Sequence, residues 1–245
     1  QRFCVLSESP IHKIFEDEKV IRNRFNRCVT HKYCLCNSFP DFYIFEPFGT
    51  SDVKTTEDVF RPKPKLLSFV GSVRHGDQHG YFFRKSVASF CKTKIDFCDC
   101  FGRGVNEIDK KQDALLPYCF SIAMENEISD CYYTEKLIDC FLSGTIPIYW
   151  GSTSVTRYFD DKGILFFKDL SELREILSII SVEKYNALLP AAARNRRLAF
   201  EKGLDSYENF LFRIVRTIYP YLDDVRLRTR RGTRFGAATR KILGL

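Results

Sequence analysis

The chain has 245 residues, of which 44% are hydrophobic and 15% aromatic, and its formal net charge is +7. This composition provides enough apolar side chains for a packed core and therefore excludes a largely disordered protein. No apolar run approaches the ~20 residues that a membrane-spanning helix requires, and we find no signal-peptide pattern; an upstream anchor stays open as an alternative.

The first sixty residues differ in composition from the rest of the chain. We predict short strands at Phe3–Leu6 and Phe42–Phe45 and a helix within Ile14–Phe25. The segment Thr50–Pro64 is polar and ends in Arg-Pro-Lys-Pro, which is typical of a linker. We therefore assign a first unit to residues 1–62.

From Lys65 onward, short apolar runs alternate with helical patterns. The predicted strands are Leu66–Val70, Lys94–Cys98, Cys119–Met124, Ile146–Trp150 and Gly163–Phe167. The predicted helices are Tyr81–Phe90, Ile108–Leu116, Thr134–Leu142, Ser154–Phe159, Leu170–Ile180, Val182–Lys202 and Ser206–Tyr219. This alternation predicts an α/β fold with a doubly wound parallel sheet over residues 63–203, followed by a C-terminal helix and basic tail over residues 204–245.

Several of the ten cysteines fall on predicted buried faces, namely Cys91, Cys98, Cys119 and Cys140. Buried free cysteine behaves as a small apolar residue. The group His31, Cys34 and Cys36 has no second ligand pair at zinc spacing. We therefore predict reduced cysteines and no structural metal. We also assign the run Tyr81–Phe83 to the core, and His31 and His75 to the surface.

The stretch from Pro117 to Ser152 places the helix Thr134–Leu142 between two buried strands. Thr134 is a suitable N-cap, and Gly144 is a suitable left-handed residue at the helix end. Polar residues concentrate in the preceding loop and the first helical turn, namely Glu125, Asn126, Glu127, Asp130, Tyr132, Tyr133, Glu135 and Lys136. A lysine in the first turn opposes the helix dipole, which favours an anionic ligand there; a solvated Glu–Lys pair is the alternative.

This string of residues resembles the donor-binding motif of the α-1,3-fucosyltransferase family, glycosyltransferase family 10. Family members read approximately F-x-x-x-F-E-N-S, then D-Y-x-T-E-K, then G-x-x-P-V-x-x-G. The corresponding residues here are Phe120, Glu125, Asn126, Asp130, Tyr132, Thr134, Glu135, Lys136, Gly144, Pro147 and Gly151. The resemblance implies a GT-B-like fold of two Rossmann-like lobes, with a reduced N-terminal acceptor lobe. The general composition is also similar to that of glycan-building transferases of large algal viruses.

The N-terminal region carries further similar segments. Leu6–His12 resembles the E-S-P-x-H segment of the family, and Asp41 falls at its D-S-D segment. By this resemblance Glu8 is the general base that takes the acceptor proton, Asp41 is the reserve candidate, and His12 orients the base or binds the acceptor. A glutamate before Ser-Pro is otherwise an ordinary turn residue.

The resemblance also implies roles in donor binding. Lys136 contacts the phosphates and Glu135 the ribose hydroxyls, while Glu125, Asn126 and Tyr132 contribute to the rest of the donor site. The family has a second phosphate-binding cation, an arginine, at a position where this chain has His79. The candidate substitutes are Arg74, Arg84 and Arg103, for each of which a solvated surface charge is the alternative.

The resemblance implies an inverting glycosyltransferase with a glycan hydroxyl as acceptor. Glycosyl transfer requires a base for the acceptor proton and positive charge for the departing diphosphate. No D-x-D triplet follows a predicted strand, so we expect no metal and no other cofactor. The family's default donor is GDP-fucose. Because His79 replaces a permanently charged residue, UDP-xylose is an alternative donor, and a non-catalytic sugar-nucleotide or glycan-binding module is the alternative class.

The C-terminal tail holds a cluster of basic residues, namely Arg226, Arg228, Arg230, Arg231, Arg234, Arg240 and Lys241. Such a cluster can bind nucleic acid or an anionic membrane surface. Without a nucleic-acid-binding motif, we expect weak membrane contact and no nucleic acid. The expected location is the cytoplasm or the cytoplasmic membrane surface, with a Golgi lumen as the alternative if an N-terminal anchor has been removed.

Overall fold

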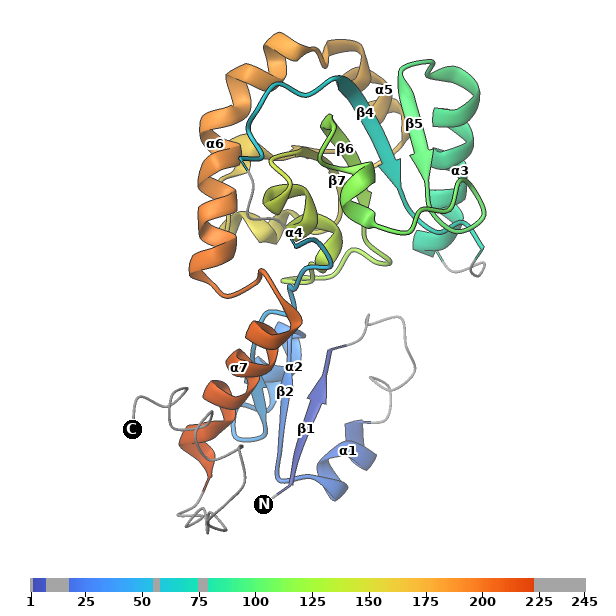
Figure 1. The fold of residues 1–245 in the computed structure, drawn as a ribbon. Helices are drawn as coiled ribbons and strands as arrows, with labels where there is room; N and C mark the ends of the chain where they lie inside the picture. The colour runs from blue at the N-terminus through green and yellow to red at the C-terminus, as the bar shows by residue number, and fades with distance from the viewer. Residues whose placement is uncertain (1, 8–17, 55–57, 75–78, 223–245) are drawn as a thin grey trace.

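A computed structural model describes residues 2–7, 18–54, 58–74 and 79–222, with His79 described by its backbone alone. Its framework is two sheets, one above the other in the view of Figure 1. The smaller sheet has the strand order β1-β2-β3 and the larger has the order β5-β4-β6-β7-β8. Every strand pair in both sheets is parallel, as predicted for an α/β fold.

The smaller sheet contains β1 (Phe3–Leu6), β2 (Arg27–Thr30) and β3 (Tyr43–Phe45). Its helices are α1 (Glu18–Arg24) and α2 (Tyr33–Ser38). The predictions found β1 and β3 but missed α2 and the central strand β2. The sequence of β2, Arg-Cys-Val-Thr, is too short to show a periodic pattern, and its burial comes from the neighbours on both sides.

The larger sheet contains β4 (Lys65–Val70), β5 (Cys98–Phe101), β6 (Tyr118–Met124), β7 (Ile146–Trp150) and β8 (Leu165–Phe166). The flanking helices are α3 (His79–Lys94), α4 (Glu135–Leu142) and α5 (Leu170–Ile179). Residues of β6 alternate between two layers. Phe120 and Ile122 pack in the core shared with α3 and α5, whereas Ala123 packs in the core shared with α4. The sheet is therefore doubly wound.

Three details of this lobe differ from the predictions. The strand predicted at Lys94–Cys98 is wrong, because α3 continues to Lys94 and β5 begins only at Cys98. Lysines in the last turn of α3 are favourable for the helix dipole. The helices predicted at Ile108–Leu116 and Ser154–Phe159 are short 3-10 turns, η2 (Lys111–Ala114) and η3 (Thr153–Arg157). Phe82 of the predicted core run is 63% exposed.

The last helices connect the two sheets. The 3-10 turn η4 (Asp161–Gly163) precedes β8, and α5 follows that strand. Helix α6 (Val182–Glu201) comes next and packs on the larger sheet and on its helix α4. The chain then turns at Gly203, whose φ of +62° is in the region that favours glycine. Helix α7 (Tyr207–Ile218), followed by η5 (Tyr219–Tyr221), packs instead on the smaller sheet, where Phe210 and Ile214 contact Val29. Figure 1 shows this crossing at the left of the molecule.

Arg213 of α7 fastens the smaller sheet to the turn between α6 and α7. Its guanidinium donates hydrogen bonds to Glu46 Oε1 (2.9 Å) and to the carbonyl oxygens of Pro47 (3.0 Å), Gly49 (2.9 Å) and Gly203 (2.6 Å). Charge-assisted bonds of this kind contribute ~1.5–3 kcal/mol each. They help to hold the carboxyl edge of the smaller sheet against the carboxyl edge of the larger one.

Candidate active site

The topology of the larger sheet marks one place for a ligand. The chain runs from β4 outward to β5 and then returns to the other side of β4 as β6, so the direction of winding reverses between β4 and β6. Ligands of open α/β sheets bind beyond the carboxyl ends of the strands at such a switch point. The loop that follows β6 approaches the start of α3 closely, because a Cβ on Gly80 would lie 1.9 Å from the Asn126 carbonyl oxygen.

Helix α4 begins and ends where the sequence predicted. Thr134 is its N-cap, and the hydroxyl oxygen accepts a bond from the backbone N–H of Lys136. At the other end Gly144 has a φ of +60°, and the N–H groups of Gly144 and Thr145 bond to the carbonyls of Phe141 and Cys140. The first turn of α4 therefore presents its side chains at the carboxyl edge of the sheet.

Glu125, which follows β6, binds the N-cap residue of α4. Its side chain is fully buried, and its carboxylate accepts bonds from the Thr134 N–H (2.9 Å), the Thr134 hydroxyl (2.7 Å) and the Tyr149 hydroxyl (3.1 Å). Burial raises the pKa of Tyr149, and the Glu125 carboxylate adds to this effect. Glu125, which we predicted to bind the donor, thus fixes the helix start by contacts within the protein.

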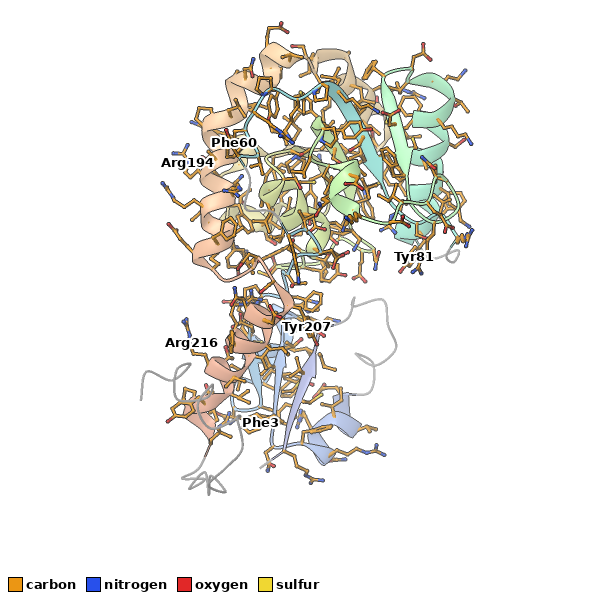
Figure 2. The ribbon with its side chains drawn as sticks, viewed as in Figure 1. Phe3, Phe60, Tyr81, Arg194, Tyr207 and Arg216 are labelled. Atoms are coloured by element: carbon orange, nitrogen blue, oxygen red, sulfur yellow. The ribbon has the colours of Figure 1, made fainter. Side chains whose placement is uncertain are left out.

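Arg84 of α3 holds the loop after β6. One guanidinium nitrogen donates to the carbonyls of Met124 (2.8 Å) and Glu125 (3.0 Å) and to Asn126 Oδ1 (2.9 Å). The guanidinium is buried and lies 5.2 Å from the centre of the Tyr81 ring. Figure 2 labels Tyr81 at the lower edge of the larger lobe. Arg84 therefore positions Asn126, and its guanidinium is bonded to the protein's own loop.

Lys136 and Glu135 lie side by side in the first turn of α4. The Lys136 ammonium is 3.0 Å from Glu135 Oε1, 3.0 Å from the Thr134 hydroxyl and 3.7 Å from Glu125 Oε2. Lys111, from η2, approaches the same Glu135 oxygen to 3.9 Å. Burial disfavours the charged form of Glu135, but Lys136 and Lys111 outweigh this cost and lower its pKa to about 2. Glu135 is therefore ionised at neutral pH.

Asp139 lies one helical turn beyond Glu135 and is fully buried. Its Oδ1 accepts bonds from the Ser51 hydroxyl (2.6 Å) and the Asp52 N–H (2.9 Å), and its Oδ2 contacts the Lys111 ammonium at 2.5 Å. Burial raises the pKa of Asp139, although Lys111 opposes that shift. Our sequence analysis missed Lys111 and Asp139. The available signal was a carboxylate on the otherwise apolar face of α4.

The smaller sheet meets this site at Tyr132. The Tyr132 ring lies 5.0 Å from the imidazole of His31, which follows β2, and both side chains are buried. Burial, with a smaller contribution from Lys32, lowers the pKa of His31 to about 4, so the imidazole is neutral at pH 7. The prediction that His31 is an ordinary surface histidine is wrong. Because β2 was not predicted, no sequence pattern indicated that the residue after it is buried.

The two exposed arginine candidates come from neighbouring loops. Arg74 follows β4, and its guanidinium lies 2.7 Å from Glu107. Arg103 lies in a turn between two glycines with positive φ, and its carbonyl accepts a bond from the Val73 N–H. Both loops follow the carboxyl ends of their strands, at the same edge of the sheet as α4's first turn. His79 begins α3 beside them.

Of the predicted catalytic and acceptor-binding residues, the structure describes Asp41 alone. Glu8 and His12 lie outside the described residues, as do His75 and the basic tail. Asp41 is exposed and precedes β3, so it lies at the opposite edge of the smaller sheet from His31. The structure does not bring Asp41 to the site, because a residue before a parallel strand lies at the edge away from the strand ends.

Three further features belong to the described part of the chain as a whole. No helix there is long and apolar enough to cross a bilayer. No group of three or more His, Cys, Asp or Glu side chains within it is arranged to hold a metal ion. A cavity of about 970 Å³ opens near the turn between α6 and α7, lined by Tyr133, Phe212 and Arg216 among others. Neither Lys136 nor Glu135 lines it, so we place the candidate site at the sheet edge on grounds of chemistry.

Comparison with known proteins identifies the larger lobe. The family model described as glycosyltransferase family 10 (fucosyltransferase), C-terminal part, matches residues 62–187. The alpha-(1,3)-fucosyltransferase FucT of Helicobacter pylori is 33% identical over 109 residues, which cover 43% of this chain and 23% of that protein. The 4-galactosyl-N-acetylglucosaminide 3-alpha-L-fucosyltransferase 9 of Rattus norvegicus is 26% identical over 187 residues, covering 74% of this chain and 49% of that protein.

A solved structure shares the fold. An alpha1,3-fucosyltransferase crystallised with GDP-fucose matches with a TM-score of 0.55 and 20% identity, covering 77% of this chain and 65% of that one. This likeness confirms the predicted GT-B-like architecture of two α/β lobes. The chain spans only about a quarter to a half of the length of the curated relatives it matches.

Replacing Glu135 by Gln tests the electrostatics of the site. A carboxylate with its pKa lowered from an ordinary 4.5 to about 2 stabilises the fold above pH 4.5, and loses that contribution as the pH falls toward 2. The shift corresponds to at most about 3 kcal/mol of unfolding free energy. Urea unfolding of wild type and Glu135→Gln should therefore differ most near pH 7 and converge near pH 2. A pH-independent difference would contradict the assigned pairing.

Proposed function

This chain belongs to glycosyltransferase family 10, and we propose on that basis that it transfers a sugar from a nucleoside-diphosphate donor to a hydroxyl group of a glycan. The expected donor is GDP-fucose. The observation that carries the proposal is the position of Lys136 and Glu135 in the first turn of α4, at the ligand-binding edge of a doubly wound sheet.

Lys136 is the proposed contact of the diphosphate. The N-terminus of a helix contributes only ~0.3–1 kcal/mol to binding an anion, whereas one charge-assisted hydrogen bond contributes ~1.5–3 kcal/mol. The ammonium group therefore supplies more of the affinity than the dipole of α4. Its present partners, Glu135 and Thr134, keep Nζ at the entrance of the site.

A second cation is expected from the loops after β4 and β5. Arg74 pairs with Glu107, and both side chains are more than half exposed. An exposed pair of this kind is worth only about 0–1 kcal/mol, so a diphosphate can replace Glu107 as the partner at little cost. Arg103 lies in the adjacent loop and is the other candidate for this role.

Glu135 is the proposed partner of the ribose. Because it is ionised at neutral pH, its carboxylate can accept bonds from two neighbouring hydroxyl groups. Asn126 and Tyr132 are proposed to contact the remainder of the donor. Asn126 is fixed for this by Arg84, and Tyr132 by its packing against His31.

The acceptor side of the proposal rests on Glu8. Strand β1 ends at Leu6, at the carboxyl edge of the smaller sheet, and Glu8 follows two residues later in the sequence. By the family resemblance, the Glu8 carboxylate would take the proton of the acceptor hydroxyl as that hydroxyl attacks the anomeric carbon from the side opposite the diphosphate, which inverts the configuration. We propose that no metal takes part, because the cationic side chains compensate the leaving charge.

A donor assay with Lys136→Met tests this function. Wild type should release GDP from GDP-fucose, faster when a suitable glycan is present, and EDTA should not change the rate. Loss of one charged contact to the diphosphate should weaken GDP affinity ~10–150-fold, since ~1.5–3 kcal/mol is lost. Calorimetry with GDP and release of GDP measure the two quantities.

Lys162→Met is the matched control, because Lys162 is an exposed lysine of the same lobe. It should behave as wild type. Binding of GDP without turnover on any acceptor would support a non-catalytic module instead, and turnover of UDP-xylose alone would exclude GDP-fucose as the donor. A strict manganese requirement would contradict the metal-free mechanism.

Glu8→Gln tests the proposed base. If Glu8 takes the acceptor proton, turnover should fall ~10²–10⁴-fold while GDP affinity stays close to wild type, because the amide cannot accept a proton. Steady-state kinetics and calorimetry separate the two effects. An equal loss of GDP binding and turnover would make Glu8 a structural residue.

A further inference from the structure

Under the proposed function, the Lys136 ammonium has two partners, the Glu135 carboxylate and the diphosphate of the donor. In the structure its ammonium lies 3.0 Å from Glu135 Oε1, and it is the nearer of the two lysines that pair with that carboxylate. A diphosphate bound at the helix start would draw the ammonium toward the phosphate oxygens. Glu135 would then be a largely buried carboxylate with a weakened partner, which is unfavourable.

A second cation is already in reach of the same oxygen. The ammonium of Lys111 lies 3.9 Å from Glu135 Oε1, and also 2.5 Å from Asp139 Oδ2 and 3.6 Å from Asp52 Oδ2. Lys111 comes from η2, not from α4, so it does not move with the first turn of that helix. Its side chain is 22% exposed.

Lys111 is also prevented from following Lys136 to the ligand. Its main partner, Asp139, is fully buried and is itself bonded to the Ser51 hydroxyl and the Asp52 N–H. Desolvation opposes the charge on Lys111, but Asp139 and Glu135 together raise its pKa. The lysine is thus a fixed positive charge beside Glu135.

We propose that Lys111 is a positioning residue, which keeps the carboxylate of Glu135 charged and in place for the donor while Lys136 turns to the diphosphate. This inference rests on the proposed function, because it assigns the two lysines different tasks in the same donor site. The charged groups around Glu135 are the cations Lys111, Lys136 and Arg84 and the carboxylates Asp52, Glu125 and Asp139. Counting Glu135, this group has four carboxylates and three cations. Removing one cation therefore leaves a further carboxylate without a compensating charge.

The test uses a double variant, Lys111→Met with Asp139→Asn. Lys111→Met alone would leave Asp139 as an uncompensated buried charge and could prevent folding. The double variant removes both charges, and the amide oxygen of Asn can still accept the bonds from Ser51 and Asp52. Lys110→Met is the matched control, because Lys110 is the neighbouring exposed lysine.

Two measurements on the folded double variant test the proposal. In the ligand-free state, carboxyl ¹³C NMR, assigned with Glu135→Gln, should show the pKa of Glu135 raised by at least one unit in the double variant. With GDP as ligand, calorimetry should show affinity reduced about 10-fold or more. That loss should grow as the pH falls from 8 toward the raised pKa of Glu135, because the carboxylate then takes up a proton and loses the charge that Lys111 maintains in wild type. Lys110→Met should match wild type in both.

Each result decides the question. Unchanged GDP affinity and an unchanged Glu135 titration in the double variant would overturn the proposal, since Lys111 would then only neutralise Asp139. A uniform loss of affinity at every pH with an unchanged Glu135 titration would also overturn it. If wild type binds no GDP, the proposed donor is wrong and the inference fails with it, and the wild-type control identifies that case.

Discussion

The site depends on the start of α4, where a buried carboxylate holds a helix N-terminus in place. Glu125 receives both the N–H and the hydroxyl of Thr134, so the N-cap is bound to the end of β6 and not only to its own helix. This contact adds to the packing of Leu137 and Ile138 on the sheet and fixes the first turn of α4 relative to β6. Lys136 and Glu135 occupy that turn, and their geometry follows from the Glu125–Thr134 contact.

The same turn is tied to the rest of the molecule through two further groups. Asp139 bonds to Ser51 and Asp52, in the segment that joins the two sheets, and Lys111 joins Asp139 to Glu135. The proposed donor contacts and the inter-lobe segment are therefore parts of one network of ion pairs and hydrogen bonds.

The sequence was most informative where local signals coincide. Thr134 as N-cap, Gly144 as the left-handed end and the apolar run of β7 lie where they were predicted, because each is determined by neighbouring residues. It failed where burial comes from distant partners. His31 follows the central strand β2, and its imidazole is packed against Tyr132 of the other lobe and near Phe48.

Some residues of the candidate site could be found from the sequence, and others could not. The group of Lys136, Glu135 and Asn126 could be found from its resemblance to the family's motif. The role of Arg84 could not be found, because its three acceptors lie about forty residues away in the chain. Asp41 was suggested by its order along the chain, and the parallel topology then placed it at the far edge of the sheet.

The central claim is that Lys136 and Glu135 hold the diphosphate and the ribose of a nucleotide donor. A crystal structure of the protein with GDP tests it most directly. The account predicts the Lys136 ammonium about 3 Å from a phosphate oxygen and the Glu135 carboxylate at hydrogen-bond distance from the ribose hydroxyls. A diphosphate bound away from the first turn of α4, for example in the cavity beside Tyr133 and Arg216, would contradict it.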